Sequence, residues 1–199
     1  ADATRMYALF AAPPDRDLEW QEEGVAGVSR FLSRVYRLTT KYAPLIRETW
    51  RTHQYSPQSV EGERLLRKLH QTIAKITQDF SGRWHFNTCI AAIMELVNAI
   101  VADEPAMDSG IVPPPAIAEI LRTLVLMLAP FAPFLAAELW EQMGGHGVVF
   151  RTAWPAADAE LARETEVEIP VQCNGKLVNV VLVPAGSDEA TVKAAALAD

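Results

Sequence analysis

The sequence predicts a mainly α-helical fold, an antiparallel helical bundle followed by a small, incomplete α+β piece that contains a β-hairpin. Apolar residues recur at helical spacing from residue 2 to about residue 143, and no strand pattern comes before residue 165. After Trp154-Pro155 the pattern changes to alternation on both sides of Asn174-Gly175, a dipeptide typical of two-residue hairpin turns. These two observations fix the order of the two parts.

Helical spacing predicts helices over about residues 2–12, 22–42, 58–80, 84–101, 115–128 and 133–143. Asp2 is expected to cap the first helix, and Pro44 is expected to end the second because proline has no backbone N–H to donate. Pro130 and Pro133, in the run LAPFAPF, are expected to separate the last two helices. Residues 102–115 are rich in Pro, Asp and Gly and are expected to form a loop.

The hairpin can be assigned a register. If Asn174-Gly175 are the two loop residues, Cys173 pairs with Lys176. The same register forms one apolar face from three couples: Val171 with Val178, Ile169 with Val180, and Val167 with Leu182. A helix is expected from about residue 188. Because a lone hairpin with one helix is marginally stable, residues 165–199 are expected to open a second domain that continues beyond the chain.

Composition describes a folded, globular chain. Of its 199 residues, 50% are hydrophobic and 22% are charged, which excludes an intrinsically disordered chain. The longest apolar runs are far shorter than the roughly 20 residues that span a bilayer. Cys89 and Cys173 follow no metal spacing, and two scattered thiols are typical of a reducing, cytoplasmic compartment. No metal cluster, nucleophile motif or phosphate-binding glycine loop is present, so neither metal ligands nor catalytic residues are expected.

The placement of charge is more informative than its total. The net charge of −7 by itself argues against a nucleic-acid partner. Residues 30–85, however, hold eleven basic side chains against four acidic ones, so this segment carries +7 and the rest of the chain carries −14. The acidic total therefore hides a strongly basic segment.

The basic residues also lie on particular faces of two predicted helices. Four of them fall within about 60° of one another on the second helix: Arg30, Arg34, Arg37 and Lys41. Four others lie opposite the apolar stripe of the third helix: Arg64, Arg67, Lys68 and Lys75. These faces are almost free of acids, and two such faces predict a surface that contacts the phosphates of a folded RNA or DNA rather than its bases. An ordinary solvated surface is the alternative.

The fourth predicted helix is apolar nearly all round, which places it at the centre of the bundle. Trp84 and Phe86 at its start are expected in the core rather than as platforms for stacked bases. Arg83 could reach a phosphate or cap a neighbouring helix. Asn87, Glu95 and Asn98 are expected to need buried partners or a position at an edge.

Several runs, in order along the whole chain, match the motifs of one family. ADATR, FAAPP and DLEW (residues 1–5, 10–14 and 17–20) resemble the segment after the KMSKS loop of bacterial-type leucyl-tRNA synthetases, which are class I enzymes. WHFNTCIAAIMELVN (84–98) and LAPFAPFLAAELW (128–140) resemble the anticodon-binding helical bundle of that family. VQCNGK (171–176) resembles the opening of its C-terminal domain, although Val178 stands where an arginine is common.

The resemblance implies a domain plan and a function. Residues 1–20 would connect a catalytic core to the bundle, residues 21–153 would form the tRNA-binding bundle, and residues 165–199 would begin a C-terminal domain. The parent enzyme would join leucine to tRNA(Leu) with ATP and magnesium, using catalytic and editing domains that precede Ala1. Because the chain begins with Ala1 rather than Met, we expect an excised piece that is inactive alone.

The implied partners are tRNA(Leu) and the enzyme's own catalytic and editing domains, in a cytoplasmic monomer without membrane contact. The residues expected to contact tRNA are the basic ones of the two faces together with two from turns: Arg30, Arg34, Arg37, Lys41, Arg64, Arg67, Lys68, Lys75, Arg83 and Lys176. Two alternatives stay open. The chain could be the equivalent domain of a valyl- or isoleucyl-type synthetase, or a helical module whose basic face docks an acidic protein.

Overall fold

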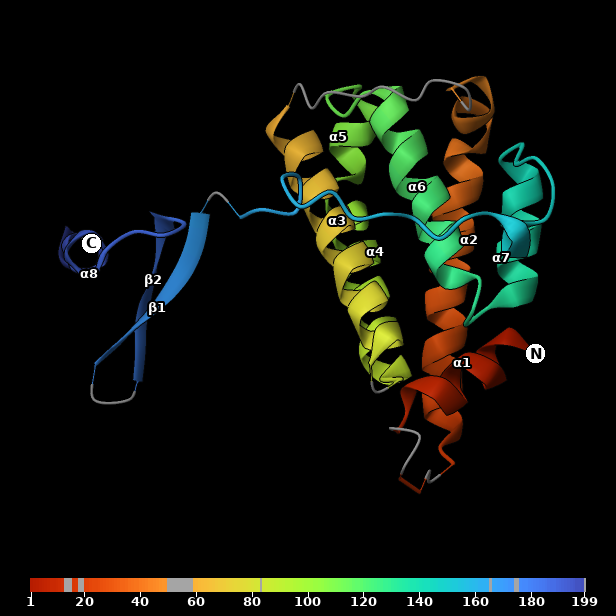
Figure 1. Ribbon diagram of the computed structural model, residues 1–199, viewed down its shortest axis with the longest axis horizontal. Helices are drawn as coiled ribbons and strands as arrows, with labels where there is room; N and C mark the ends of the chain where they lie inside the picture. The colour runs from red at the N-terminus through yellow and green to blue at the C-terminus, as the bar shows by residue number, and fades with distance from the viewer. Residues whose placement is uncertain are drawn as a thin grey trace. The chain divides into compact units, whose positions relative to one another are not determined.

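A computed structural model describes residues 1–12, 16–17, 20–49, 59–82, 84–164, 166–173 and 176–198. The chain divides into two compact units, Ala1–Ala162 and Arg163–Asp199. The first unit is a helical bundle and the second holds a two-stranded sheet with one helix (Figure 1). The predicted fold class, mainly α with a small hairpin-containing piece, is confirmed.

The first unit contains a series of α-helices and one short 3-10 helix. They are α1 (Asp2–Phe10), α2 (Glu22–Thr49), α3 (Val60–Ser81), α4 (Phe86–Ala102), α5 (Glu104–Asp108), α6 (Pro114–Leu128), α7 (Pro133–Gln142) and the 3-10 helix η1 (Val149–Arg151).

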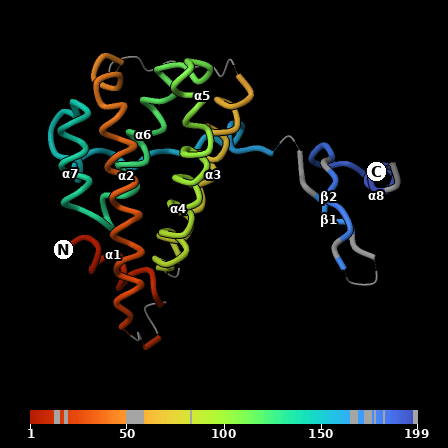
Figure 2. The backbone as a smooth tube through the Cα atoms, turned by 180° about the vertical axis from the view of Figure 1, so that it is seen from behind, coloured from red at the N-terminus to blue at the C-terminus, as the bar shows by residue number. Residues whose placement is uncertain are grey.

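Helices α2, α4, α3 and α6 form the four corners of the bundle. Helix α4 packs on α3, α3 packs on α6, and α6 packs on α2. Figure 1 shows α6 between α2 and α3 on the near side, and Figure 2, from behind, shows α4 between them on the other side. Helices α2 and α3 therefore stand diagonally across the bundle. Helix α1 packs on α2 and α4, while α7 packs on α2 and α6.

Helix α4 is a corner of the bundle, not its centre as predicted. One face of α4 is completely buried: Cys89, Ile90, Ile93, Leu96, Val97 and Ile100. Glu95 and Asn98 lie on an exposed edge. Helix α6 is the more buried helix because the extended segment after η1 crosses it (Figure 1). An apolar helix with small residues, such as Ala91 and Ala92, can leave that side partly exposed without exposing a large apolar area.

The prediction that Pro44 ends the second helix is wrong, because α2 continues through it to Thr49. A proline inside a helix removes one backbone hydrogen bond and costs several kcal/mol, roughly 3. Here Pro44 lies on the exposed side, and the buried stripe continues past it with Ala43 and Ile46. The apolar packing of that last turn holds the helix together.

The region predicted as a loop, residues 102–115, contains the short helix α5. Pro105 lies in its first turn, where a backbone N–H would have no helical acceptor, so the missing N–H of proline costs no hydrogen bond. Met107 is buried and anchors the turn to the bundle. The polar composition of this stretch predicted a loop, whereas the burial of Met107 holds a short helix there.

Asp2 does not cap its own helix, so the predicted cap of the first helix is wrong. Its carboxylate instead accepts backbone hydrogen bonds from Leu135 at 2.7 Å and Phe134 at 3.4 Å, in the first turn of α7. The first turn of a helix has backbone N–H groups without acceptors, so a carboxylate there is favourable. Helix α7 follows the break at Pro130, which the structure confirms.

The second unit contains β1 (Glu166–Cys173), β2 (Lys176–Pro184) and α8 (Glu189–Ala198). The strands are antiparallel and Cys173 pairs with Lys176 as predicted, whereas Asn174-Gly175 lie outside the described residues. The rest of the predicted register is wrong by one residue, because an irregularity between Val171 and Gln172 shifts the pairing.

The shift changes which valines of the hairpin are buried. Ile169 pairs with Val181, and both Val181 and Val183 are buried. Val178 and Val180, which the predicted register placed on the apolar face, are exposed. Helix α8 packs on β2.

Candidate nucleic-acid interface

The predicted basic rows of α2 and α3 flank the exposed edge of α4. Because α2 and α3 stand diagonally with α4 between them, side chains from both can reach toward α4 (Figure 2). Glu95 and Asn98 of α4 each bond to one row: Glu95 to Lys68 of α3 and Asn98 to Arg34 of α2. This side of the bundle is the candidate interface.

At one end of this side, acids from α5 neutralise the row on α2. The Arg37 guanidinium donates to both carboxylate oxygens of Glu104, each at 3.0 Å. Lys41 Nζ lies 2.8 Å from Glu104 and 2.7 Å from Asp108. The Tyr42 hydroxyl donates to the other oxygen of Asp108 at 2.7 Å. Two cations and two carboxylates thus form one closed network.

The network shifts the acidity of its members. Hydrogen bonds from Arg37 and Lys41 lower the pKa of Glu104 to about 2. Hydrogen bonds from Lys41 and Tyr42 lower the pKa of Asp108, and burial raises the pKa of Tyr42 to about 12. Both carboxylates are therefore ionised at neutral pH and cancel the charge of the cations that they hold.

Three of the four cations in the row on α3 are neutralised in the same way. Arg64 forms an ion pair with Asp103, whose side chain is only 7% exposed. Lys68 pairs with Glu95 of α4 at 2.7 Å. Lys75 pairs at 2.7 Å with Asp79, one turn further along α3. A neutralised cation attracts a phosphate much less than an unpaired one.

Asp79 is held by more than Lys75. Burial favours protonation of this carboxylate, yet hydrogen bonds from Lys75 and Thr88 outweigh it and the pKa of Asp79 is lowered. The Thr88 hydroxyl donates to Asp79 at 2.5 Å and ties the start of α4 to the end of α3.

The prediction of faces almost free of acids is therefore wrong for the folded surface. The basic residues do lie in rows, but five of them meet acids: Arg37, Lys41, Arg64, Lys68 and Lys75. Four of the acids come from α4, α5 and the turn between them, which lie far from the basic residues in sequence: Glu95, Asp103, Glu104 and Asp108. Periodicity within a single helix does not reveal these acids, although the acid-rich stretch 103–108 is a visible signal in the sequence.

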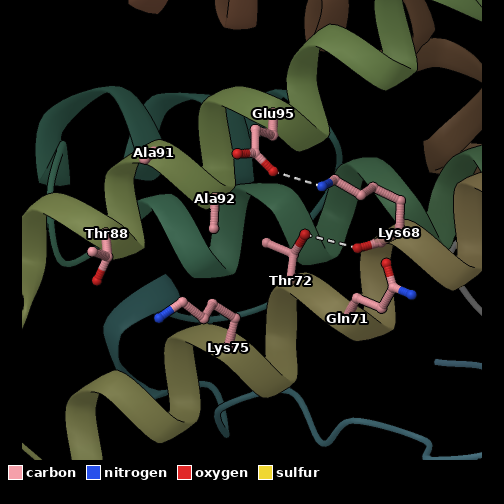
Figure 3. Close-up of a pocket in the computed structure, with 8 residues that line it drawn as sticks. All are labelled: Lys68, Gln71, Thr72, Lys75, Thr88, Ala91, Ala92 and Glu95. Carbon is pink, nitrogen blue, oxygen red and sulfur yellow. Dashed lines mark hydrogen bonds and ion pairs between the residues drawn. The ribbon is translucent and has the colours of Figure 1, made fainter. Parts of the chain in front are cut away.

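Two grooves lie on either side of α4. The first, between α3 and α4, has a volume of about 380 Å³ and is drawn in Figure 3. Its floor is made of small side chains, including Ala91, Ala92 and Thr72, and Lys68 lies along its edge toward Glu95 (Figure 3). Its lysines are the paired ones described above.

The second groove lies between α1, α2 and α4 and has a volume of about 500 Å³. Arg30 and Arg34 line it. Arg34 Nη1 donates to the amide oxygen of Asn98 at 2.9 Å, a neutral partner. Within the described part of the chain, neither arginine has an acidic partner.

The remaining predicted site residues lie elsewhere. Arg67 is on α3, lines neither groove, and has no acidic partner among the described residues. Lys176 is exposed at the start of β2 in the second unit, and Arg83 lies outside the described residues. The structure thus brings eight of the ten predicted residues onto two diagonal helices of one unit, and leaves their contact with tRNA a prediction.

Trp84 departs from its predicted place in the core. Its side chain is 59% exposed, and its backbone has φ of 56°, a left-handed conformation that is uncommon for a residue other than glycine. The ring contacts Phe86 edge-on, with 5.8 Å between ring centroids. Phe86 is half-buried and packs against the core, so the prediction holds for Phe86 alone.

Other chemistry has little support in the described residues. They contain no group of three or more His, Cys, Asp or Glu side chains placed to hold a metal ion. Burial raises the pKa of the Cys89 thiol to about 11, so it is protonated at neutral pH. No described helix is both long and apolar enough to cross a membrane.

Comparison with known proteins identifies the relatives of this chain. Residues 63–193 match a family model described as the anticodon-binding domain of tRNA ligase. The chain is 47% identical over its full length to a leucine–tRNA ligase of Solibacter usitatus and 45% identical to one of Geotalea daltonii. It spans 23% and 24% of those two proteins, about a quarter of their length.

A solved structure is similar over the whole chain as well. It is LeuRS of Agrobacterium radiobacter in a ternary complex with tRNA and LeuAMS, with a TM-score of 0.81 and 32% sequence identity. All of this chain and 25% of that one are covered. These relatives confirm the resemblance to leucyl-tRNA synthetases that the motifs predicted.

Proposed function

This chain belongs to the anticodon-binding domain family of tRNA ligases, and we propose that it is the tRNA-binding part of a leucine–tRNA ligase. In this proposal the bundle binds tRNA(Leu) and positions it for leucylation by a catalytic core outside this chain. The observation that carries the proposal is the family match over residues 63–193. The similar LeuRS was solved in complex with tRNA, which supports RNA as the partner.

The bundle would act by contact with phosphates. It offers cations from α2 and α3 on both sides of α4, and among the described residues Arg30 and Arg34 have no acidic partner. Contacts to phosphates fix the position and orientation of a nucleic acid without reading its sequence. Positioning is the task that such a surface can perform, and the bond-making steps are assigned to other domains.

The domain plan and the parent reaction complete the proposal. Residues 1–20 would connect to the catalytic core, residues 21–153 would form the tRNA-binding bundle, and residues 165–199 would open a C-terminal domain. ATP and magnesium would bind to the catalytic core, and we assign no step of that chemistry to residues of this chain. The ligase would be a cytoplasmic monomer whose catalytic and editing domains are the other partners of the bundle.

Binding of the chain to tRNA(Leu) over a series of salt concentrations tests the proposal. We expect binding that weakens linearly on a logarithmic salt scale, because counterions are released from phosphates. Arg34→Glu with Lys68→Glu should weaken it further, while the matched double variant Arg5→Glu with Arg151→Glu should change it less. Arg5 and Arg151 are exposed and line neither groove.

Equal, salt-independent affinity for tRNA(Leu) and for an uncharged polymer would contradict the proposal. Far-UV circular dichroism of each variant would show whether the helical fold is kept. A tight complex with an acidic protein, together with no binding of tRNA, would instead favour the protein-interaction alternative.

A further inference from the structure

We propose that the groove between α1, α2 and α4 is the seat of two consecutive phosphates of the bound RNA strand, held by Arg30 and Arg34. This inference rests on the proposed function and makes it specific. It assigns the principal RNA contact to one groove and gives the paired cations of the interface a structural task.

The groove has the shape and lining that a sugar–phosphate backbone requires. Its floor is apolar, formed by Phe10 of α1, Phe31 of α2 and Met94 of α4. The two arginines and Asn98 supply its polar groups, and its lining contains no acid from the described part of the chain. A ribose can lie over an apolar floor while its phosphates stay at the charged rim.

The two arginines are spaced for neighbouring phosphates. They are four residues apart on α2, so their Cα atoms are separated by about 6 Å along the helix axis and lie on the same face. Guanidinium groups bind phosphate through two parallel hydrogen bonds, which makes arginine well suited to this contact. One phosphate would sit on each guanidinium.

Arg34 is also oriented before RNA arrives. The hydrogen bond to Asn98 holds its guanidinium at the groove and leaves its full positive charge uncompensated, because an amide is neutral. A side chain that is already ordered loses less entropy on binding. Asn98 is therefore a positioning residue for Arg34.

The Arg30 guanidinium lies beside Gly27, which is on the same helix. A Cβ atom at this position would lie 3.8 Å from Nη2 of Arg30, so the guanidinium extends over the surface of a residue without a side chain. Gly27 also lines the groove.

The five cations of the interface that are paired with acids are less available to phosphate. RNA would have to break the ion pairs of Lys68 with Glu95 and of Lys75 with Asp79 before those lysines gained a phosphate. Arg37 and Lys41 would likewise have to leave Glu104. The gain from such an exchange is small, whereas Arg30 and Arg34 lose no acidic partner among the described residues.

The salt dependence of tRNA(Leu) binding by the full chain tests this assignment. Each lost phosphate contact lowers the slope of log affinity against log salt by about 0.7–0.9. We expect Arg30→Gln with Arg34→Gln to lower it by about 1.4–1.8 and to raise Kd roughly 20- to 60-fold at 0.1 M salt. The matched double variant Arg5→Gln with Arg151→Gln should keep a slope within about 0.5 of the wild type.

Asn98→Asp gives a second test that does not remove an arginine. The substitution keeps the size of the side chain and converts the neutral partner of Arg34 into an acid. We expect the slope to fall by about 0.7–0.9, as in Arg34→Gln, because Arg34 becomes a paired cation like the others. A merely structural role for Asn98 would leave the slope unchanged, since the hydrogen bond to Arg34 is kept.

The outcomes separate this inference from the proposed function. Salt-dependent binding of tRNA(Leu) that is equal in wild type and in the Arg30/Arg34 double variant would overturn the inference and leave the proposed function standing. No binding by the wild type would overturn both. Unchanged tRNA binding together with lost binding of a poly-glutamate peptide would overturn the inference and assign the groove to a protein.

Discussion

The two grooves beside α4 share one helix and differ in what their cations face. In the α3–α4 groove, Lys68 meets a carboxylate of α4 and Lys75 meets one of its own helix. In the α1–α2–α4 groove, Arg34 meets an amide and Arg30 meets no acid among the described residues. Similar rows of basic residues thus give one neutralised groove and one positive groove. The identity of a single partner residue on α4, Glu95 or Asn98, makes much of the difference.

The largest expected effect comes from the buried face that both grooves share. Ile93 of α4 is completely buried. We expect Ile93→Ala to lower the free energy of unfolding by about 2–5 kcal/mol, and Ile93→Val by about 0.5–1.5 kcal/mol, because the cavity grows with the atoms removed. Urea denaturation measures both. Equal, small losses would show that α4 does not support the two grooves through this side chain.

Two glycines of α2, Gly24 and Gly27, line the positive groove, but only Gly24 packs closely against α1. A Cβ at Gly24 would lie 2.3 Å from the ring of Tyr7, which is buried and whose hydroxyl accepts a hydrogen bond from the backbone of Gln21. We expect Gly24→Ala to displace α1 and cost about 1–3 kcal/mol. Gly27→Ala meets only ordinary contacts and should stabilise α2 by about 0.5–1 kcal/mol.

Thermal unfolding compares the two variants directly, since each adds the same methyl group to the same helix. Stabilisation by Gly24→Ala would contradict the close packing of α1 on α2, and with it the α1 wall of the positive groove.

Low pH should loosen the network between α2 and α5. The pKa of Glu104 lies at about 2, below its ordinary value of 4.5, so its ionised form stabilises the folded state. That contribution is fully present above about pH 4.5 and is lost as the pH falls from there toward 2. We expect the urea midpoint of the wild type to fall more steeply over this range than that of Glu104→Gln. Parallel curves would show that the network adds no stability.

The smallest expected effect converts the neutralised groove toward the positive one. Glu95→Gln leaves Lys68 with a neutral partner, as Arg34 has in Asn98. Because the Glu95 side chain is 65% exposed, stability should change by less than about 1 kcal/mol. The salt slope of tRNA(Leu) binding should rise by up to about 0.9 as Lys68 gains a phosphate. A lower slope would show that the acid assists binding.

Much of the fold follows from residue spacing, because helical periodicity and strand alternation are local patterns. The stripe of α2 and the break at Pro130 were predictable for that reason. The continuation of α2 past Pro44 was not predictable, because the packing of Ala43 and Ile46 outweighs the cost of a proline inside the helix. The register of the hairpin was not predictable, because an alternating pattern of apolar residues does not reveal an irregularity in the pairing of the strands.

The candidate site was predictable only as rows of cations. Whether a cation stays unpaired depends on residues that meet it after folding, such as Glu104, which is 67 positions from Arg37. No periodicity within one helix contains that information. The prediction that Trp84 lies in the core was wrong for a related reason. An aromatic residue before a helix is buried only if the backbone there directs its side chain inward, and helical spacing does not determine this.

The separation in sequence of these partners also bears on the kinetics of folding. Arg34 and Asn98 are 64 positions apart, and Arg37 and Glu104 are 67 apart, so both contacts require α2 and the α4–α5 segment to be docked first. Contacts that close long loops tend to form late, after the transition state. Their removal should therefore speed unfolding and leave the folding rate nearly unchanged. The polar contacts beside α4 would then slow the opening of the bundle.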